Sequence, residues 1–141
     1  MDELVEVRLS RIVIREDSDR QYIFVTEREG ERGFPIVIGT AEAIEIHRVV
    51  RGADHERPLT HQLASSIITE LGAKLLSCDI VALKQNTFYA LLRLEGVAGD
   101  VEVDARPSDA IALSLRAGGK LRVAETVLSQ VRTDSGPDEL E

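Results

Sequence analysis

The sequence predicts an α+β fold, namely a β-rich single domain with an internal duplication: two three-stranded units each end in a helix, and a connecting helix joins them. Three observations lead to this prediction. The chain has 141 residues, the size of one domain, and 43% of them are hydrophobic, enough to form a core. Hydrophobic residues alternate with period two and then switch to helical spacing, twice along the chain. Short matching stretches recur at an offset of about 67–68 residues.

The internal repeat consists of short identities in the same order. Ile12-Val13 corresponds to Ile80-Val81 in the second copy, and Glu42 falls on Asp109. A single offset indicates one duplicated unit rather than a solenoid of many copies. The expected parts are copies at about 4–52 and 73–118, a connecting helix at about 60–71, a domain of residues 1–131 and an acidic disordered tail at 132–141.

Each copy is expected to contain three strands. Val5, Val7 and Leu9 alternate with charged or polar residues, which is typical of a half-buried strand. Turn residues separate this strand from those that follow, and the same order returns in the second copy. The other strands are expected at 22–27 and 34–38 in the first copy, and at 74–83, 88–94 and 101–104 in the second.

Helical spacing follows the third strand of each copy and also fills the connection between the copies. Glycines are expected to end these three helices, at Gly52, Gly72 and Gly118. A short strand at 121–123 and a helix at 125–131 close the domain. The apolar stripes that predict the helices are Ala43, Ile46 and Val50; Leu63, Ile67 and Leu71; and Ala110, Leu113 and Ala117.

The charge balance argues against tight binding of nucleic acid without a metal ion. The chain has 17 Lys and Arg residues against 25 Asp and Glu residues, a net charge of −8, whereas phosphate backbones are bound by cations. Aromatic residues make up 4% of the chain, so no base-stacking platform is expected. Four of the acids lie in residues 133–141, and 14 of the 17 cations are arginines, which suit forked contacts with phosphate. The acidic total therefore still allows a small basic pocket.

Several other classes of protein are not expected. Cys78 is the one cysteine, which excludes an intramolecular disulfide and a multi-cysteine zinc site. No apolar run is long enough to cross a membrane, and the start Met1-Asp2-Glu3 is unlike a signal peptide, so a cytoplasmic protein without membrane partners is expected. The motifs of zinc proteases, serine hydrolases and cysteine enzymes are missing.

Two Arg-Pro pairs, Arg57-Pro58 and Arg106-Pro107, each open a predicted helix. Proline holds the preceding arginine extended beside the free N–H groups of the helix start, a combination suited to phosphate or carboxylate. The alternative is that the polar residues at these starts only cap the helices, with Asp109 accepting a backbone N–H.

His61 is the best candidate for acid–base chemistry, because it lies in the first turn of a helix, four residues after Arg57. A helix start favours the neutral imidazole, which can accept a proton; the alternative is a partly exposed histidine without a catalytic role. Hydrolysis of a phosphodiester at neutral pH also calls for carboxylates that hold a divalent metal. Glu42 and Asp109 would face each other if the two copies pack about a pseudo-twofold axis.

Three stretches of the chain resemble the bifunctional nuclease (BFN) domain family. They are PIVIG at 35–39 with Glu42-Ala43, RPLTH at 57–61, and DARPSDAIAL at 104–113, and TFYA at 87–90 also fits. The resemblance covers about residues 4–131 in the family's order. It implies an α+β fold that self-associates and an endonuclease that acts on DNA and RNA. This chain has Gln62 where the family often has an acid after the motif histidine.

The resemblance, taken with the chemistry of the residues, assigns a site. The expected catalytic residues are His61, Asp109 and Asp104; the expected substrate-binding residues are Arg57, Arg106, Thr60 and Ser108; and the expected ligands of Mg²⁺ or Mn²⁺ are Glu42, Asp104 and Asp109.

Three interpretations remain open from the sequence. The first is a nuclease with little sequence preference, assisted by a divalent metal, that binds DNA and RNA weakly and forms a homodimer or higher homo-oligomer. The second is a non-enzymatic dimeric binding module that recognises an anionic ligand or an acidic protein segment. The third is a structural corner in which Arg106 and Asp104 form an internal ion pair. A shared site requires that Arg57, His61, Arg106 and Asp109 converge.

Overall fold

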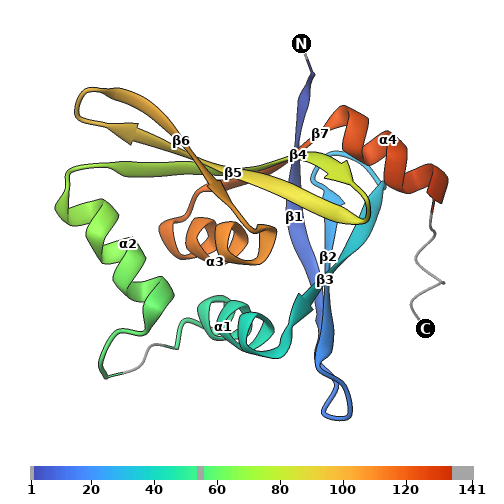
Figure 1. The fold of residues 1–141 in the computed structure, drawn as a ribbon, viewed down its shortest axis with the longest axis horizontal. Helices are drawn as coiled ribbons and strands as arrows, with labels where there is room; N and C mark the ends of the chain where they lie inside the picture. The colour runs from blue at the N-terminus through green and yellow to red at the C-terminus, as the bar shows by residue number, and fades with distance from the viewer. Residues whose placement is uncertain (1, 54–55, 135–141) are drawn as a thin grey trace.

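The computed structural model describes residues 2–53 and 56–134. These residues form one seven-stranded sheet and four helices, the α+β fold that the sequence predicts (Figure 1). The elements are β1 (Leu4–Val13), β2 (Arg20–Glu27), β3 (Gly33–Gly39), α1 (Thr40–Arg51), α2 (Thr60–Glu70), β4 (Lys74–Lys84), β5 (Thr87–Gly96), β6 (Gly99–Ala105), α3 (Pro107–Ala117), β7 (Lys120–Ala124) and α4 (Glu125–Asp134).

β7 joins two antiparallel meanders into one sheet. The strand order is β3-β2-β1-β7-β4-β5-β6, so β1–β3 make one half and β4–β6 the other. β7 pairs antiparallel with β1 and parallel with β4. The two halves cross steeply in Figure 1, as strongly twisted strands do. Each half is three strands followed by a helix, the order expected of the two copies, while their origin by duplication stays a prediction.

The core lies between the curled sheet and its helices. α1 packs on α3, and α3 lies on β4, β5 and β7, so that Ile46 and Ile111 are fully buried. α4 packs on β3, β4 and β7. The rings of Phe34 and Phe88 stack with their centroids 5.2 Å apart. This contact places the edge strand β3 beside the start of β5, although four strands separate them within the sheet.

Some stripe residues are more exposed than the periodicity predicts. Val50, in the last turn of α1, is 55% exposed, and Leu63 and Ile67 of α2 are each 50% exposed. α2 has no buried residue at all. It docks on α3 and β4 through the neighbouring face of the helix, with Ala64 and Ile68 against the core. The apolar stripe therefore identified the helix correctly but not the face that packs.

The closing helix is longer than the sequence predicts. α4 continues to Asp134, so residues 132–134 belong to this helix and not to the expected tail. The rest of that tail, residues 135–141, lies outside the described residues. Among the helices that the structure describes, none has the length and hydropathy of a membrane span.

A buried ion pair holds β7 in register with β4. Arg122 and Asp79 are opposite residues in this parallel pair. Nε and Nη2 of Arg122 donate to Oδ1 and Oδ2 of Asp79 at 2.8 and 2.7 Å, and Nη2 also donates to the Ser77 hydroxyl at 3.3 Å. Asp79 is only 2% exposed, and the hydrogen bonds to it raise the pKa of Arg122. The pair therefore fixes the two halves of the sheet relative to each other.

Removing the guanidinium should destabilise the fold strongly. We expect Arg122→Met to lower the free energy of unfolding in urea by about 3 kcal/mol, because it leaves the Asp79 carboxylate buried without its partner. The double variant Arg122→Met/Asp79→Leu should recover most of this loss. Arg93→Met removes an exposed pair whose atoms are 3.8 Å apart, and should cost about 0.5 kcal/mol or less. A loss in Arg122→Met as small as this control would contradict the role of the pair.

Candidate functional site

Four of the predicted site residues meet at the starts of three helices. α1 follows β3 directly, α3 follows β6, and His61 lies in the first turn of α2. Glu42 and Asp109 each occupy the third position of their helix, counted from the N-caps Gly39 and Arg106. The two carboxylates thus hold equivalent places, and both are close to the positive ends of helix dipoles.

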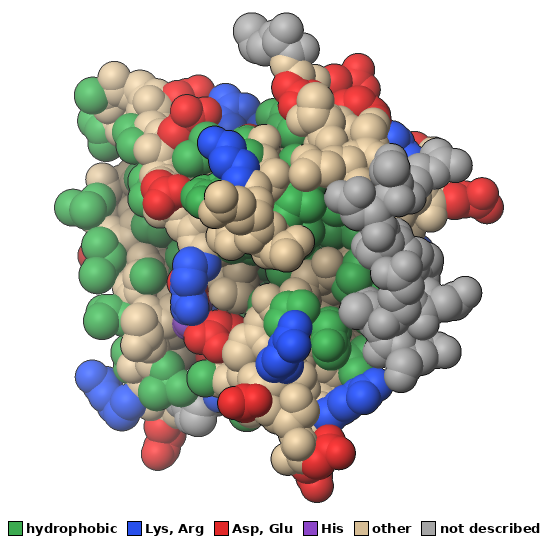
Figure 2. Space-filling model, turned by 45° about the vertical axis from the view of Figure 1, so that its right-hand side comes forward, with side chains coloured by type: hydrophobic (Ala, Val, Ile, Leu, Met, Phe, Trp, Pro, Cys, Tyr) green, Lys and Arg blue, Asp and Glu red, His purple; other side chains and the backbone are tan. Residues whose placement is uncertain are grey.

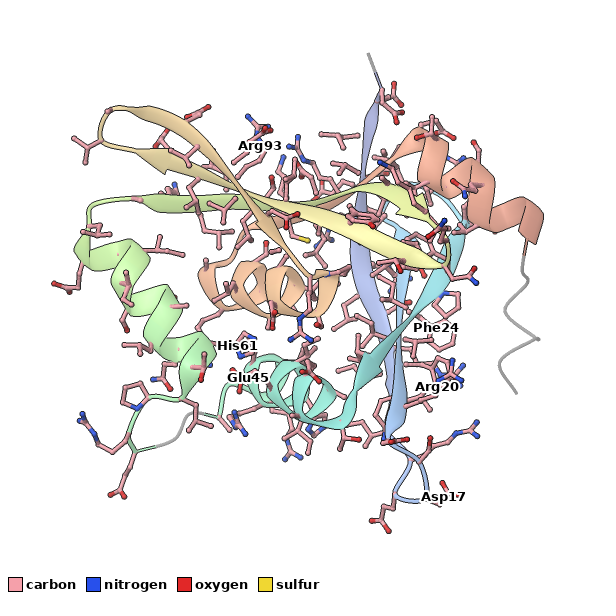
Figure 3. All side chains as sticks on the ribbon, viewed as in Figure 1. Asp17, Arg20, Phe24, Glu45, His61 and Arg93 are labelled. Atoms are coloured by element: carbon pink, nitrogen blue, oxygen red, sulfur yellow. The ribbon has the colours of Figure 1, made fainter. Side chains whose placement is uncertain are left out.

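Asp109 is the centre of a hydrogen-bonded cluster. Its Oδ1 lies 2.8 Å from Nε2 of His61 and accepts a hydrogen bond from Nη2 of Arg106 at 3.2 Å. Its Oδ2 accepts a hydrogen bond from Nε of Arg106 at 2.9 Å. Nη2 of Arg106 also donates to Oε2 of Glu42 at 3.3 Å. Figure 3 shows His61 projecting from α2 toward α1 and α3, so three helices contribute to one cluster.

The carboxylate of Asp109 does not cap its helix. Arg106 is the N-cap of α3, and no side chain makes a cap hydrogen bond there. The oxygens of Asp109 are used instead by the His61 ring and the Arg106 guanidinium. The first N–H groups of α3 are therefore left beside a cation, as the anion-site interpretation requires.

The electrostatics of the cluster keep Asp109 ionised. Burial of this carboxyl opposes ionisation, but hydrogen bonds from Arg106 and then His61 outweigh burial and hold the pKa of Asp109 below its usual value. The same contacts raise the pKa of Arg106. Because an ionised carboxylate only accepts hydrogen bonds, Nε2 of His61 is the donor toward Asp109. Nδ1 is then the ring nitrogen that can take up a proton.

Gly39 leaves room for the Glu42 carboxylate. Oε1 of Glu42 lies against Gly39, in the space that a Cβ at residue 39 would occupy. A side chain at this position would push the carboxylate away from Arg106. The glycine of the PIVIG stretch therefore helps to place a charged group of the cluster.

Three other predicted residues lie outside the cluster. Arg57 and Thr60 are exposed and make no side-chain hydrogen bond or ion pair within residues 2–53 and 56–134. Asp104 is exposed on β6, opposite Leu91 of β5. Arg106 pairs with Glu42 and Asp109 instead of Asp104, so the ion pair expected of a structural corner is absent from the described part of the chain.

Ser108 opens onto a cleft beside the cluster. This cleft, of about 500 Å³, is lined by the edge strand β3, the β4–β5 turn and the start of α3. Ser108 is only 6% exposed, and among the described residues its hydroxyl has no hydrogen-bond partner. The sequence motifs contain Ser108, but they gave no role to the opposite wall. The PIVIG stretch and the Gln85-Asn86 turn were the signals that could have indicated it.

The cluster does not form a metal site as it stands. Among the described residues, no three His, Cys, Asp or Glu side chains are placed to hold one metal ion. The guanidinium of Arg106 bridges the carboxylates of Glu42 and Asp109, where a cation would otherwise bind. The third expected ligand, Asp104, lies on β6. Assistance by Mg²⁺ or Mn²⁺ therefore stays a prediction.

The fold and the site define an α+β domain in which helix starts hold an Arg–carboxylate–His cluster beside a cleft. Residues 23–135 match the bifunctional nuclease domain family, and the chain belongs to this family, as its motifs predict. It is similar to an uncharacterized protein of Mycobacterium tuberculosis, found in strains CDC 1551 / Oshkosh and ATCC 25618 / H37Rv. This chain and the M. tuberculosis protein are 38% identical over 125 residues, which span 89% of this chain and 74% of the relative.

Loss of the guanidinium should change the titration of Asp109. We expect Arg106→Gln to raise the pKa of Asp109, because His61 alone would then oppose the effect of burial. The carboxyl carbon shift of Asp109, followed by NMR as pH is lowered, measures this pKa. Arg57→Gln changes the other Arg-Pro start and should leave the titration unchanged. An unshifted titration in Arg106→Gln would show that the guanidinium does not hold this carboxylate in solution.

Proposed function

We propose that this protein is a nuclease that hydrolyses phosphodiester bonds in DNA and RNA with little sequence preference. The observation that carries the proposal is the His61–Asp109–Arg106 cluster beside a cleft, in a chain that belongs to the bifunctional nuclease domain family. A proton acceptor, a carboxylate that orients it and a neighbouring cation are groups that hydrolysis of a phosphodiester can use.

His61 is the general base in this proposal. Its Nε2 is held by the ionised Asp109, which fixes the ring so that Nδ1 can take a proton from the attacking water. The same histidine can then return the proton to the leaving oxygen. Asp109 is thus a positioning residue, and its hydrogen bond to His61 gives the ring one orientation.

Arg106 and the start of α3 bind the phosphate. The carboxylates use Nε and Nη2 of Arg106, and Nη1 is left for a phosphate oxygen. Ser108 and the start of α3 line the same cleft and supply a hydroxyl and backbone N–H groups as further donors. Arg57 and Thr60, exposed at the start of α2, contact the backbone further along the nucleic acid. Contacts of this kind carry no base information, which accounts for the low sequence preference.

Mg²⁺ or Mn²⁺ is the proposed assisting ion; of the ligands expected from the sequence, Glu42 and Asp109 lie in the cluster, whereas Asp104 lies apart on β6. Because Arg106 bridges the carboxylates of Glu42 and Asp109, the proposed roles of His61, Asp109 and Arg106 do not depend on the metal. A metal ion would supply further positive charge for the phosphate in a chain of net charge −8.

The test is a cleavage assay on labelled DNA and RNA with Mg²⁺, Mn²⁺ or EDTA. His61→Ala and Asp109→Asn should each lower the cleavage rate about 100-fold or more. His47→Ala removes an exposed histidine of α1 and should leave the rate unchanged. All variants should have the same melting temperature as the wild type. If the cleavage rate is unchanged in both His61→Ala and Asp109→Asn, the cleavage comes from a contaminant, and the assignment of the site is contradicted.

A non-enzymatic binding module is the second candidate. One observation favours it: Arg106 and Ser108 line the cleft, whereas neither His61 nor Asp109 is among its lining residues. The same Arg106 and Ser108 would then bind an anionic ligand or an acidic protein segment without cleaving it. Binding of labelled DNA that depends on Arg106, with no cleavage under any metal condition, would support this candidate over the nuclease.

We also propose that the protein self-associates through an apolar surface, here called the α2 face. It consists of Leu63 and Ile67 on α2, Leu71 directly after the helix and Val97 in the β5–β6 turn, all exposed. Cγ2 of Val97 lies 3.3 Å from the place that a Cβ on Gly72 would take, so the turn adjoins the end of α2. Figure 2 shows hydrophobic side chains along the left edge of the molecule, the side of α2 and this hairpin in Figure 1.

A second copy of the chain is the occupant that the charges favour. α2 has one formally charged residue, Glu70, in a chain that is 30% charged and has a net charge of −8. Two acidic copies repel each other except through a face of this kind. Asp100, Glu102 and Asp104 alternate along the edge strand β6, and these like charges oppose pairing of two β6 strands. Contact through the α2 face is therefore preferred to contact through the strand edge.

Substitutions that introduce charged side chains on the α2 face should prevent self-association. We expect the wild type to elute with at least twice the mass of one chain in size-exclusion chromatography with light scattering. Leu63→Glu/Ile67→Glu should have the mass of one chain, because it buries two carboxylates in the interface. Val50→Glu, at an equally exposed valine of α1, should keep the wild-type mass. A monomeric wild type, or an unchanged mass in the double variant, would contradict the interface.

A further inference from the structure

The cleft beside Arg106 is larger than the proposed chemistry needs. Its volume of about 500 Å³ lies within the range of pockets that hold one small ligand. Its walls are the edge strand β3, the β4–β5 turn and the start of α3, with Asp19 and Arg20 at the rim. Arg20 and His61 are far apart in Figure 3, so the cleft extends from Arg106 away from the histidine. The proposed hydrolysis uses only the end at Arg106.

That end of the cleft suits a phosphate. Ser108 is 94% buried as a residue, and its hydroxyl has no hydrogen-bond partner among the described residues. The residue lines the cleft, so this hydroxyl is available to a ligand there. Ser108 lies at the uncapped start of the 11-residue helix α3 and lines the same cleft as Arg106. These donors together favour an anionic group with several oxygens.

The middle of the cleft is apolar and suits the face of a base. Pro35 and Val37 of the edge strand β3 are among its lining residues, and Val37 is 46% exposed. Phe88 of β5 also lines the cleft, and its ring is held by stacking on Phe34. Asn86, in the left-handed conformation with φ of 63°, adds a polar side chain at the rim that can meet a base edge.

The rim of the cleft is held in place by a buried glutamine. Gln21 is fully buried, and its Nε2 donates to the carbonyls of Arg15 and Ser18 at 2.9 and 2.7 Å and to the Thr40 hydroxyl at 3.1 Å. Its Oε1 accepts a hydrogen bond from the Arg15 N–H at 2.6 Å. These bonds tie the β1–β2 connection, next to Arg20, to the start of α1. The cleft is therefore shaped before any ligand binds.

We propose that this cleft binds one unpaired nucleotide, with its phosphate at Ser108 and Arg106 and its base against Phe88, beside Val37. The proposal rests on the proposed nuclease function for its reaction, and it makes single-stranded DNA and RNA the substrates. A base inside a duplex reaches such a cleft only by flipping out, which costs its stacking and pairing. An extended peptide along β3 fits less well, because Pro35 removes a backbone N–H from this edge.

The test measures binding in the His61→Ala background with EDTA at low salt, so that the probes stay intact. The probes are a labelled single strand and a duplex of the same sequence whose two ends are closed by loops. We expect the single strand to bind at least about tenfold more tightly by fluorescence anisotropy. Val37→Glu should weaken this binding at least about tenfold and leave duplex binding unchanged, because it places a carboxylate against the base. Val50→Glu, the same change at an exposed valine of α1, should affect neither probe.

Two outcomes would overturn the proposal: equal affinity for both probes, or single-strand binding that Val37→Glu leaves unchanged. A competition experiment tests where the phosphate of the nucleotide binds. AMP should displace the single strand at concentrations at least about tenfold lower than adenosine, which lacks the phosphate. Equal displacement by adenosine would overturn this placement. Displacement by an extended uncharged peptide, with none by AMP, would overturn the proposal in favour of strand addition to β3.

The cleft assignment, tested by binding, and the nuclease function, tested by cleavage, can be refuted independently of each other. A protein that binds the single strand with the expected dependence on Val37, yet cleaves no substrate, retains the cleft assignment and refutes the nuclease. A protein that cleaves single strands and closed duplexes at equal rates retains the nuclease and refutes the cleft assignment. The two proposals can therefore be judged independently.

Discussion

The parallel pairing of β7 with β4 is the constraint on which the site depends. β7 lies between the two meanders, and the two hydrogen bonds from the Arg122 guanidinium to the Asp79 carboxylate hold it in one register. A slip by one residue would turn the guanidinium to the opposite face of the sheet. α1 and α3 follow the third strands of the two halves, so the same register places Glu42 against Arg106. A contact in the middle of the sheet thus determines the geometry at the helix starts.

The cluster reconciles an acidic chain with the proposed site for anions. Glu42 and Asp109 come from equivalent places in their helices, and as a pair of like charges they would repel each other and any phosphate. The guanidinium of Arg106 lies between them and leaves one nitrogen without a carboxylate. The net charge of −8 therefore describes the surface as a whole, whereas the start of α3 presents a hydroxyl, backbone N–H groups and part of a cation.

The local elements could be predicted because their signals are local. Alternation predicts the strands, glycines mark the helix ends, and the Arg-Pro pair with its motif predicts the start of α3. The partner of Asp79 could not be predicted, because Asp79 lies in an apolar run and Arg122 is 43 residues away. Periodicity also identifies an apolar stripe without showing whether a neighbour covers it, as Leu63 shows. The cleft has no local signal, since it exists only where the curled sheet places β3 beside β5.

α2 contributes His61 to the site but no buried residue to the core. A helix without buried residues should open at a lower free energy than the elements around it, and we expect its amide protons to exchange with solvent deuterium before those of α3. Each opening takes the imidazole away from Asp109 and leaves Arg106 and Glu42 paired on α1 and α3. In the proposed nuclease, the fraction of time that α2 is docked would limit the turnover, and a second copy seated on α2 would increase that fraction.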